Sequence, residues 1–231
     1  MLGKLKKQVL EANLEIKNKD LILYTWGNVS GIDRDKSLIV IKPSGVPYQE
    51  LTVDKMVIVN LKGKLIEGEL RPSSDTATHL FLYNNFSNIK GVVHTHSPWA
   101  TSWAQAKKNI PCYGTTHADH FYQDIPCTRV MSDAEINNNY ETNTGKVILE
   151  EFTNKNRDYH YTPGVLVAGH GPFTWGEDVE KAVYNSVVLE EIAKIAFQTC
   201  QLNDKVSKVS DTLLNKHFFR KHGKDAYYGQ Q

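Results

Sequence analysis

Three histidines and one aspartate in this chain are spaced so that they could bind a metal ion. His94 and His96 are one residue apart at the end of a short apolar run that is typical of a buried strand. Side chains at positions i and i+2 of a strand point to the same face of the sheet, so both rings can reach one ion. His170 ends a second apolar run, and Asp75 stands at the start of an expected helix. Three imidazoles and a carboxylate would fill most of the coordination sphere of a zinc-like ion, which predicts a metal-dependent enzyme.

Each of these four residues also has an ordinary structural explanation. With nine histidines in 231 residues, one His-X-His pair is a weak motif by itself. Strand-end histidines can bond to backbone or water, and the two glycines that flank His170 are common in hairpins. A carboxylate at Asp75 would also favour the dipole of a helix that begins there. The metal hypothesis therefore depends on the remaining motifs.

A second group of polar residues could bind an anion. Lys42-Pro-Ser44-Gly45 can be a simple turn, and one of the serines Ser73 and Ser74 can be an ordinary helix cap. Alternatively, the hydroxyl groups and the Gly45 amide form an anion-binding nest to which Lys42 adds charge.

Three further segments carry polar groups with two possible explanations. Gly27-Asn28 is either a turn or a place where the Asn28 amide meets a ligand, and the segment from Thr115 to Asp119 can be a polar loop. His217, Arg220 and Tyr228 can be surface groups of a basic final helix and its tail. Taken singly, none of these segments decides between structure and function.

Composition excludes several classes of function. The formal net charge is +1, so there is no basic field for nucleic acid. The three cysteines are an odd, widely spaced set without a Cys-X-X-Cys motif, which favours a reducing compartment. No run approaches the roughly 20 apolar residues of a membrane span. We therefore expect a soluble, cytoplasmic protein that binds neither nucleic acid nor membrane.

The elements that must position these residues alternate between helices and short strands joined by tight turns. This pattern predicts one α/β domain over residues 1–231, with a central mixed, largely antiparallel sheet flanked by helices. Helices are expected over 2–18, 75–86, from Pro98, from the capping box Ser132–Glu135, over 178–200, and over 206–222 with a C′ glycine at Gly223. Strands are expected over 37–42, 56–60, 64–67, 91–94, 164–168 and 173–175.

Taken together, the motifs resemble the class II aldolase/adducin family, and within it the sugar-phosphate epimerase branch. The resemblance extends in the same order from about residue 2 to the last glutamine. The histidine pair is shared by the general family, whereas Thr116-His-Ala-Asp119 and the Tyr-Tyr-Gly ending indicate the epimerase branch. The matching segments are Trp26-Gly-Asn-Val-Ser30, Lys42-Pro-Ser-Gly45, Pro72-Ser-Ser-Asp75-Thr, His94-Thr-His96-Ser, Thr116-His-Ala-Asp119, Gly169-His170-Gly-Pro and Arg220-Lys-His-Gly-Lys-Asp-Ala-Tyr-Tyr-Gly-Gln.

The resemblance implies a class II aldolase-like fold and an epimerase that interconverts L-ribulose 5-phosphate and D-xylulose 5-phosphate. The hydrogen on C4 is not acidic, so the implied route is retro-aldol cleavage of the C3–C4 bond and re-addition to the other face of the aldehyde. The implied cofactor is one divalent metal per subunit, Zn²⁺ above others, held by Asp75, His94, His96 and His170. A homotetramer with sites between neighbouring subunits is also implied.

The resemblance further assigns roles to the other residues. Asp119 and Tyr228 would be the two opposed acid/base groups, contributed by the adjacent chain. The substrate would be bound by Gly27, Asn28, Lys42, Ser44, Gly45, Ser73, Ser74, Thr115, Glu141, His217 and Arg220.

Two alternative functions stay open at the level of sequence. A class II aldolase acting on a ketose 1-phosphate would use a glutamate where this chain has Asp75. A non-catalytic, adducin-like module would lack the metal ligands, all four of which are present here.

Overall fold

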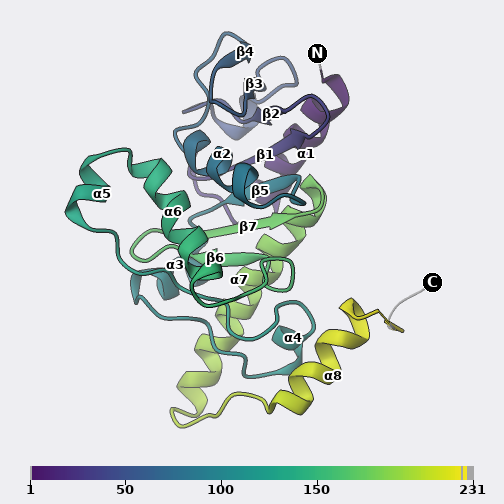
Figure 1. Ribbon diagram of the computed structural model, residues 1–231, viewed down its shortest axis with the longest axis vertical. Helices are drawn as coiled ribbons and strands as arrows, with labels where there is room; N and C mark the ends of the chain where they lie inside the picture. The colour runs from purple at the N-terminus through teal and green to yellow at the C-terminus, as the bar shows by residue number, and fades with distance from the viewer. Residues whose placement is uncertain (1, 225, 228–231) are drawn as a thin grey trace.

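One seven-stranded sheet forms the centre of the molecule (Figure 1). The computed structural model describes residues 2–224 and 226–227. The predicted α/β fold, a sheet flanked by helices, is confirmed. The sheet was predicted to be mixed and largely antiparallel, and in the described chain every pairing between neighbouring strands is antiparallel. The strand order is β4-β3-β2-β1-β5-β7-β6. The strands are β1 (Asn28–Asp33), β2 (Leu38–Ile41), β3 (Val57–Asn60), β4 (Leu65–Glu67), β5 (Gly91–His94), β6 (Gly164–Leu166) and β7 (Pro172–Gly176).

Helices cover both faces of the sheet (Figure 1). Helices α2 and α6 pack on one face, and α1 and α7 pack on the other. Helix α8 lies away from the sheet, beside the short α4. The helices are α1 (Gly3–Asn18), the 3-10 helix η1 (Tyr48–Glu50), α2 (Thr76–Asn85), α3 (Pro98–Gln105), α4 (Thr115–Ala118), α5 (Asp133–Asn137), α6 (Tyr140–Thr153), α7 (Val179–Leu202) and α8 (Asp211–His222).

Strands β2, β3 and β5 bury apolar side chains on both faces because helices cover both faces of the sheet. In β5, Val92 packs in the core with α2 and α6, and the next residue, Val93, packs in the core with α1 and α7. This alternation is the period of two that a strand imposes. Strand β5 pairs with β1 through Asn28 and His94 and with β7 through His94 and Phe173, so His94 ends the strand between two neighbours.

A glycine allows α7 to approach the start of β5. A Cβ atom built on Gly91 would lie 2.5 Å from the carbonyl oxygen of Asp178 and 2.7 Å from the Cα of Val179. Asp178 caps α7 by accepting a hydrogen bond from the Lys181 amide. The long helix is therefore fixed against the strand that carries His94.

Most predicted elements are confirmed, and the capping box between Ser132 and Glu135 forms as expected. Three differences stand out. The sequence analysis did not predict β1, α4 or α6. Helix α8 begins at Asp211 rather than at 206, because Ser210 caps it by accepting a hydrogen bond from the Leu213 amide. Gly223 ends α8 with a φ of −78°, so it is not the left-handed C′ glycine that was predicted.

Within residues 2–224 and 226–227, no helix combines the length and the apolar character needed to span a membrane.

Candidate active site

The three predicted metal-binding histidines meet at one end of the central strands. His94 is the last residue of β5, His96 follows two positions later, and His170 lies in the tight turn between β6 and β7. One potential ligand atom from each ring lies within 4.8 Å of the other two. Gly169, with a φ of +74°, allows that turn, and the His170 amide donates to the carbonyl of Val167. The antiparallel pairing of β5 with β7 thus brings together residues that are far apart in the sequence.

The hydrogen bonds of His94 fix which of its ring nitrogens faces His96 and His170. Its Nδ1 donates to the carbonyl oxygen of Pro172 at 3.0 Å, and its ring stacks on Phe173 at 4.2 Å between centroids. The Nε2 atom therefore points to His96, whose own Nε2 is 3.1 Å away. Such a spacing suits a hydrogen bond between two neutral rings and also suits two ligands of one ion.

The other two rings are held in the neutral form. Burial, together with the neighbouring histidines, lowers the pKa of His96 to about 4 and that of His170 to about 3. At neutral pH these rings therefore carry free lone pairs. Neutral imidazole is the form of histidine that binds metal ions.

Asp75 borders the same histidines from the start of α2. It stands at the N-cap position but makes no side-chain cap; instead its Oδ2 accepts a hydrogen bond of 2.6 Å from the Asn28 amide. Burial raises the pKa of the Asp75 carboxyl, but nearby His94, His79 and His170, together with the hydrogen bond from Asn28, outweigh burial, so its pKa lies below the usual range. The carboxylate is therefore ionised at neutral pH. It lines the cavity of the histidines without belonging to the compact three-nitrogen group.

A cavity of about 580 Å³ lies in front of the histidines. Twelve of the predicted site residues line it. They are Gly27, Asn28, Lys42, Ser44, Gly45, Ser73, Ser74, Asp75, His94, His96, Glu141 and His170.

The two serine-containing loops of this cavity are joined by backbone hydrogen bonds. The Ser44 amide donates to the carbonyl of Arg71, and the Ser73 amide donates to that of Lys42. Gly45, with a φ of +69°, completes the first loop. The hydroxyl groups of the two loops are therefore presented to one cavity by a rigid backbone.

A buried cation lies at the base of these loops. Lys42 is 2% exposed, and its Nζ contacts the Pro43 carbonyl at 3.2 Å and lies 4.9 Å from the centre of the Tyr48 ring. Burial lowers its pKa to about 8. No carboxylate forms an ion pair with this ammonium among the described residues. An ammonium group that is buried in this way favours an anionic ligand.

Four predicted residues lie outside this cavity in the single chain. Asp119 accepts hydrogen bonds from His217 and Arg220, and Lys221 lies 3.6 Å from its carboxylate. Burial raises the pKa of Asp119, but the hydrogen bonds from Arg220 and His217 and the charges of Arg220 and Lys221 outweigh burial, and the pKa falls below its usual range. Thr115 begins α4, which ends beside Asp119. Tyr228 lies outside the described residues.

The sequence analysis missed two aromatic residues that line the cavity, Trp26 and Tyr140. The Tyr140 hydroxyl lies 3.4 Å from Nδ1 of His170. Trp26 is 52% exposed and packs edge-on at 6.4 Å from the His96 ring. Trp26 stood within a recognised motif, but no pattern in the sequence distinguished Tyr140 from other aromatic residues.

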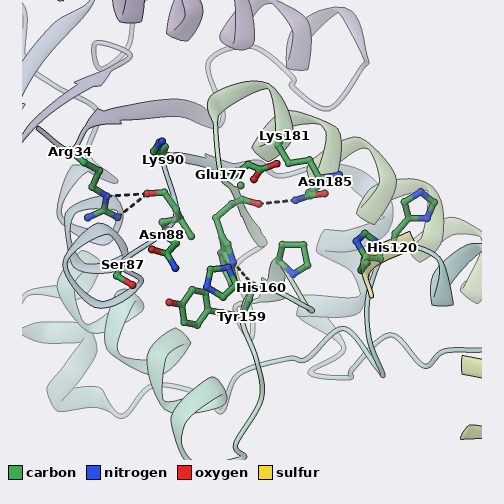
Figure 2. A pocket seen from close by; sticks show the side chains of 15 residues that line it. Arg34, Ser87, Asn88, Lys90, His120, Tyr159, His160, Glu177, Lys181 and Asn185 are labelled. Carbon is green, nitrogen blue, oxygen red and sulfur yellow. Dashed lines mark hydrogen bonds between the residues drawn. The ribbon is translucent and has the colours of Figure 1, made fainter. Parts of the chain in front are cut away.

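A second cavity, of about 670 Å³, lies near the opposite end of β5 and is lined by basic side chains (Figure 2). Most of these groups already have partners within the chain. The Arg34 guanidinium donates to the carbonyls of Tyr83, Phe86 and Ile89. His120 bonds through its ring to Tyr184. Although this cavity is larger, it lacks the convergent set of neutral imidazoles and hydroxyl groups that the histidine cavity has.

The donor set of the histidine cavity fits a divalent metal ion. Three imidazoles, two of them kept neutral by burial, approach one point, and an ionised carboxylate lies beside them. The buried Oδ1 of Asn28 has no hydrogen-bond partner among the described residues, so this cavity also holds an unused acceptor. Nitrogen donors with a nearby carboxylate suit zinc and neighbouring first-row metals.

Comparisons with known proteins agree with this geometry. Residues 7–197 match the class II aldolase and adducin N-terminal domain. The chain is 54% identical over 230 residues, all of both proteins, to the L-ribulose-5-phosphate 4-epimerase UlaF of Salmonella paratyphi C (strain RKS4594).

Solved structures show the same fold. An L-fuculose 1-phosphate aldolase superposes with a TM-score of 0.78 at 23% identity, covering 93% of this chain and 94% of its own. The L-fuculose 1-phosphate aldolase of Glaciozyma antarctica PI12 superposes with a TM-score of 0.74 at 15% identity, covering 97% of this chain and 84% of its own. The sheet, the position of the histidines on it and the match over most of the sequence lead to one conclusion: the chain belongs to the class II aldolase and adducin family.

Proposed function

We propose that this protein is a metal-dependent epimerase that interconverts L-ribulose 5-phosphate and D-xylulose 5-phosphate. The observation that carries the proposal is the shared cavity: a three-histidine group lines the same 580 Å³ space as a buried lysine that has no ion-pair partner among the described residues. A phosphosugar offers hydroxyl and carbonyl oxygens to an ion bound by the three histidines, and it offers a phosphate to Lys42. The 54% identity to an L-ribulose-5-phosphate 4-epimerase over the whole chain supports this substrate.

His94, His96, His170 and Asp75 would hold one divalent ion, which we propose to be Zn²⁺. An ion bound there supplies a Lewis acid beside the substrate carbonyl. The Asn28 amide holds the Asp75 carboxylate in place through a hydrogen bond of 2.6 Å.

The phosphate would be bound by the two joined loops and by Lys42. The amides of Ser44 and Ser73 already join the two loops, so the Gly45 amide and the hydroxyl groups of Ser44, Ser73 and Ser74 would form the nest that binds phosphate. Gly27 and Asn28 would border the substrate from the start of β1. Anchoring the phosphate keeps a cleaved two-carbon fragment from escaping.

The two acid/base groups would come from the neighbouring chain of a homotetramer. In one chain Asp119 lies in its own cluster and does not line the histidine cavity, which supports a site shared between subunits. Its low pKa favours the carboxylate, so we assign Asp119 as a proton acceptor and Tyr228 as the opposed group. Thr115, Glu141, His217 and Arg220 would complete the surroundings of the substrate.

The proposed reaction has three steps: cleavage of the C3–C4 bond, rotation of the aldehyde fragment and re-addition. One acid/base group removes the proton of the C4 hydroxyl, and the C3–C4 electron pair passes to C3 as C4 becomes an aldehyde carbon. The aldehyde fragment turns about its anchored phosphate. C3 adds to the other face of the carbonyl, and the opposed group returns a proton to the C4 oxygen.

A coupled assay of the zinc-loaded protein on L-ribulose 5-phosphate tests the proposal by following D-xylulose 5-phosphate and free glycolaldehyde phosphate together. We expect xylulose product without free aldehyde, and loss of product after chelation. If free aldehyde accumulates instead, the protein is an aldolase. The fold shared with two aldolases supports that alternative, and the same assay with a ketose 1-phosphate as substrate would test it.

We also propose that the protein works in the cytoplasm. The three cysteines are free thiols, which supports a reducing compartment.

A further inference from the structure

Tyr140 is a polar neighbour of His170, one of the three histidines of the cavity. His94 is fixed by a hydrogen bond to the Pro172 carbonyl and by stacking on Phe173. The ring of His170 stands on a turn between two glycines, and among the described residues the one hydrogen-bond partner of this ring is the Tyr140 hydroxyl, 3.4 Å from Nδ1.

The backbone at Tyr140 is held firmly. Tyr140 is the first residue of α6 and follows Asn139, which takes a left-handed conformation with a φ of +55°. The side-chain amide of Asn143 donates to the carbonyls of Glu135 and Asn138, which closes the turn that leads into α6. The hydroxyl of Thr144 donates to the Tyr140 carbonyl at 3.0 Å.

Helix α6 is in turn fixed to α2, the helix that begins beside Asp75. The Thr78 hydroxyl donates to the carbonyl of Glu141 at 2.7 Å. Gly145 allows a close approach, since a Cβ atom there would lie 2.7 Å from the Cβ of Phe81. The Tyr140 hydroxyl is therefore a fixed point on one wall of the histidine cavity, beside the ring of His170.

We propose that Tyr140 is a positioning residue for metal binding: its oxygen accepts a hydrogen bond from Nδ1 of His170 and so turns Nε2 of that ring toward His94 and His96. The hydrogen bond selects the tautomer and the rotation of His170, as the Pro172 carbonyl does for His94. Partners of this kind typically change metal affinity by 10–100-fold when they are removed. The inference rests on the proposed function in one respect, that the three histidines bind a metal ion.

The test compares metal affinity in the full chain before and after Tyr140→Phe, which removes one oxygen and keeps the ring. Competition with a chromophoric chelator gives the dissociation constant for Zn²⁺. We expect it to rise 10–100-fold. In the Co²⁺-loaded protein we expect the visible absorption bands of the variant to shift, because the geometry around His170 relaxes.

The matched control is Tyr184→Phe. Tyr184 also bonds through its hydroxyl to a histidine, His120, at 2.9 Å, but this pair lies outside the histidine cavity. The control should leave both the Zn²⁺ affinity and the Co²⁺ spectrum unchanged. Equal thermal midpoints of the metal-free proteins would show that neither variant disturbs the fold.

A second measurement needs no variant at position 140. Long-range proton–nitrogen NMR of the histidine rings in the zinc-loaded protein reports which nitrogen of His170 carries the proton, and His170→Gln assigns the signal. We expect a proton on Nδ1. Zinc affinity within twofold of wild type in Tyr140→Phe, or a proton on Nε2 of His170, would overturn the inference.

These outcomes are distinct from failure of the proposed function. If the wild-type chain binds zinc and epimerises the sugar phosphate while Tyr140→Phe behaves identically, only the positioning role is wrong. If the wild-type chain binds no zinc, the metal-binding part of the proposed function and the role of Tyr140 are both wrong.

Discussion

The buried ammonium of Lys42 should give the enzyme a pH dependence on the alkaline side. Its pKa is lowered to about 8 by burial, so the group is charged below that pH and neutral above it. A neutral amine attracts a phosphate dianion far less strongly. We expect kcat/KM for the sugar phosphate to fall tenfold per pH unit above about pH 8, because this parameter reports the free enzyme.

The control for this pH dependence is Lys42→Arg, which keeps the charge at all accessible pH values. The decline above pH 8 should disappear in the variant even if its overall rate is lower. An identical decline in wild type and variant would show that another group titrates.

Removing one imidazole tests the metal site by stability. Zinc that binds only the folded chain should stabilise it by about 4 kcal/mol at a free concentration of about 1,000 times its dissociation constant. We expect calorimetry to show a higher thermal midpoint for wild type on addition of Zn²⁺. His96→Ala should show little of this increase, and a full increase in the variant would contradict the assigned ligands.

At the scale of single residues, the sequence predicted the site residues whose proximity follows from neighbouring positions in the chain. His94 and His96 were found because an i, i+2 pair at a strand end shares one face. Tyr140 was not found, because its approach to His170 depends on the docking of α6 against α2, which single-residue spacing does not encode. Likewise, no local pattern shows that Asp119 is enclosed by His217 and Arg220.

Among the elements, the contact between α7 and β5 leaves no room for a single additional methyl group. Gly91→Ala would place a Cβ atom within 2.5 Å of the Asp178 carbonyl oxygen, so strand and helix must separate. We expect the variant to lose about 1–3 kcal/mol of unfolding free energy, as in other overpacked cores. Thermal unfolding of the two proteins measures this loss as a lower midpoint.

Gly114→Ala serves as the comparison, since a Cβ atom at that glycine meets nothing within 4 Å and its φ is −153°. It should unfold close to the wild-type temperature. Equal losses in both variants would mean that glycine flexibility, rather than the contact between helix and strand, determines the stability.

Elements with a regular apolar period were predictable, and the exceptions have physical causes. Strand β1 contains Asn28, Ser30, Gly31 and Asp33, so it lacks the alternation expected of a strand. It is nevertheless buried, because Ser30 is hydrogen-bonded to the His79 ring at 2.7 Å and to the Tyr83 hydroxyl at 2.9 Å. Those partners come from α2, and only the tertiary fold supplies them.

The molecule as a whole carries two separate groups of polar residues that could take part in the reaction. The histidine cavity lies at the ends of the central strands, whereas Asp119 and its cationic partners belong to α4 and α8, away from the sheet (Figure 1). The proposed site needs both groups and would therefore combine two copies of the chain. For the proposed homotetramer we expect a particle of four times the 26.2 kDa chain mass in light scattering after gel filtration.

Mixing two inactive variants tests this sharing directly. His96→Ala removes a metal ligand from one cavity, and Tyr228→Phe removes an acid/base group that we assign to the neighbour. After subunit exchange, some sites would contain both intact groups, so a fraction of the activity should return. No recovery in verified mixed tetramers would place both groups in one chain. Two preparations of His96→Ala mixed together provide the background.

The turn between β6 and β7 also determines when the metal can be acquired. During synthesis His94 and His96 emerge early, but His170 comes much later, and β5 finds β7 only after that. Until His170 is made, a nascent chain therefore offers only two of the three histidines of this group. Because long-range strand pairing is slow compared with local helix formation, metal selection is deferred to the finished fold. In the proposed metal site, the ion would thus bind a completed sheet, as the last component of assembly rather than as its nucleus.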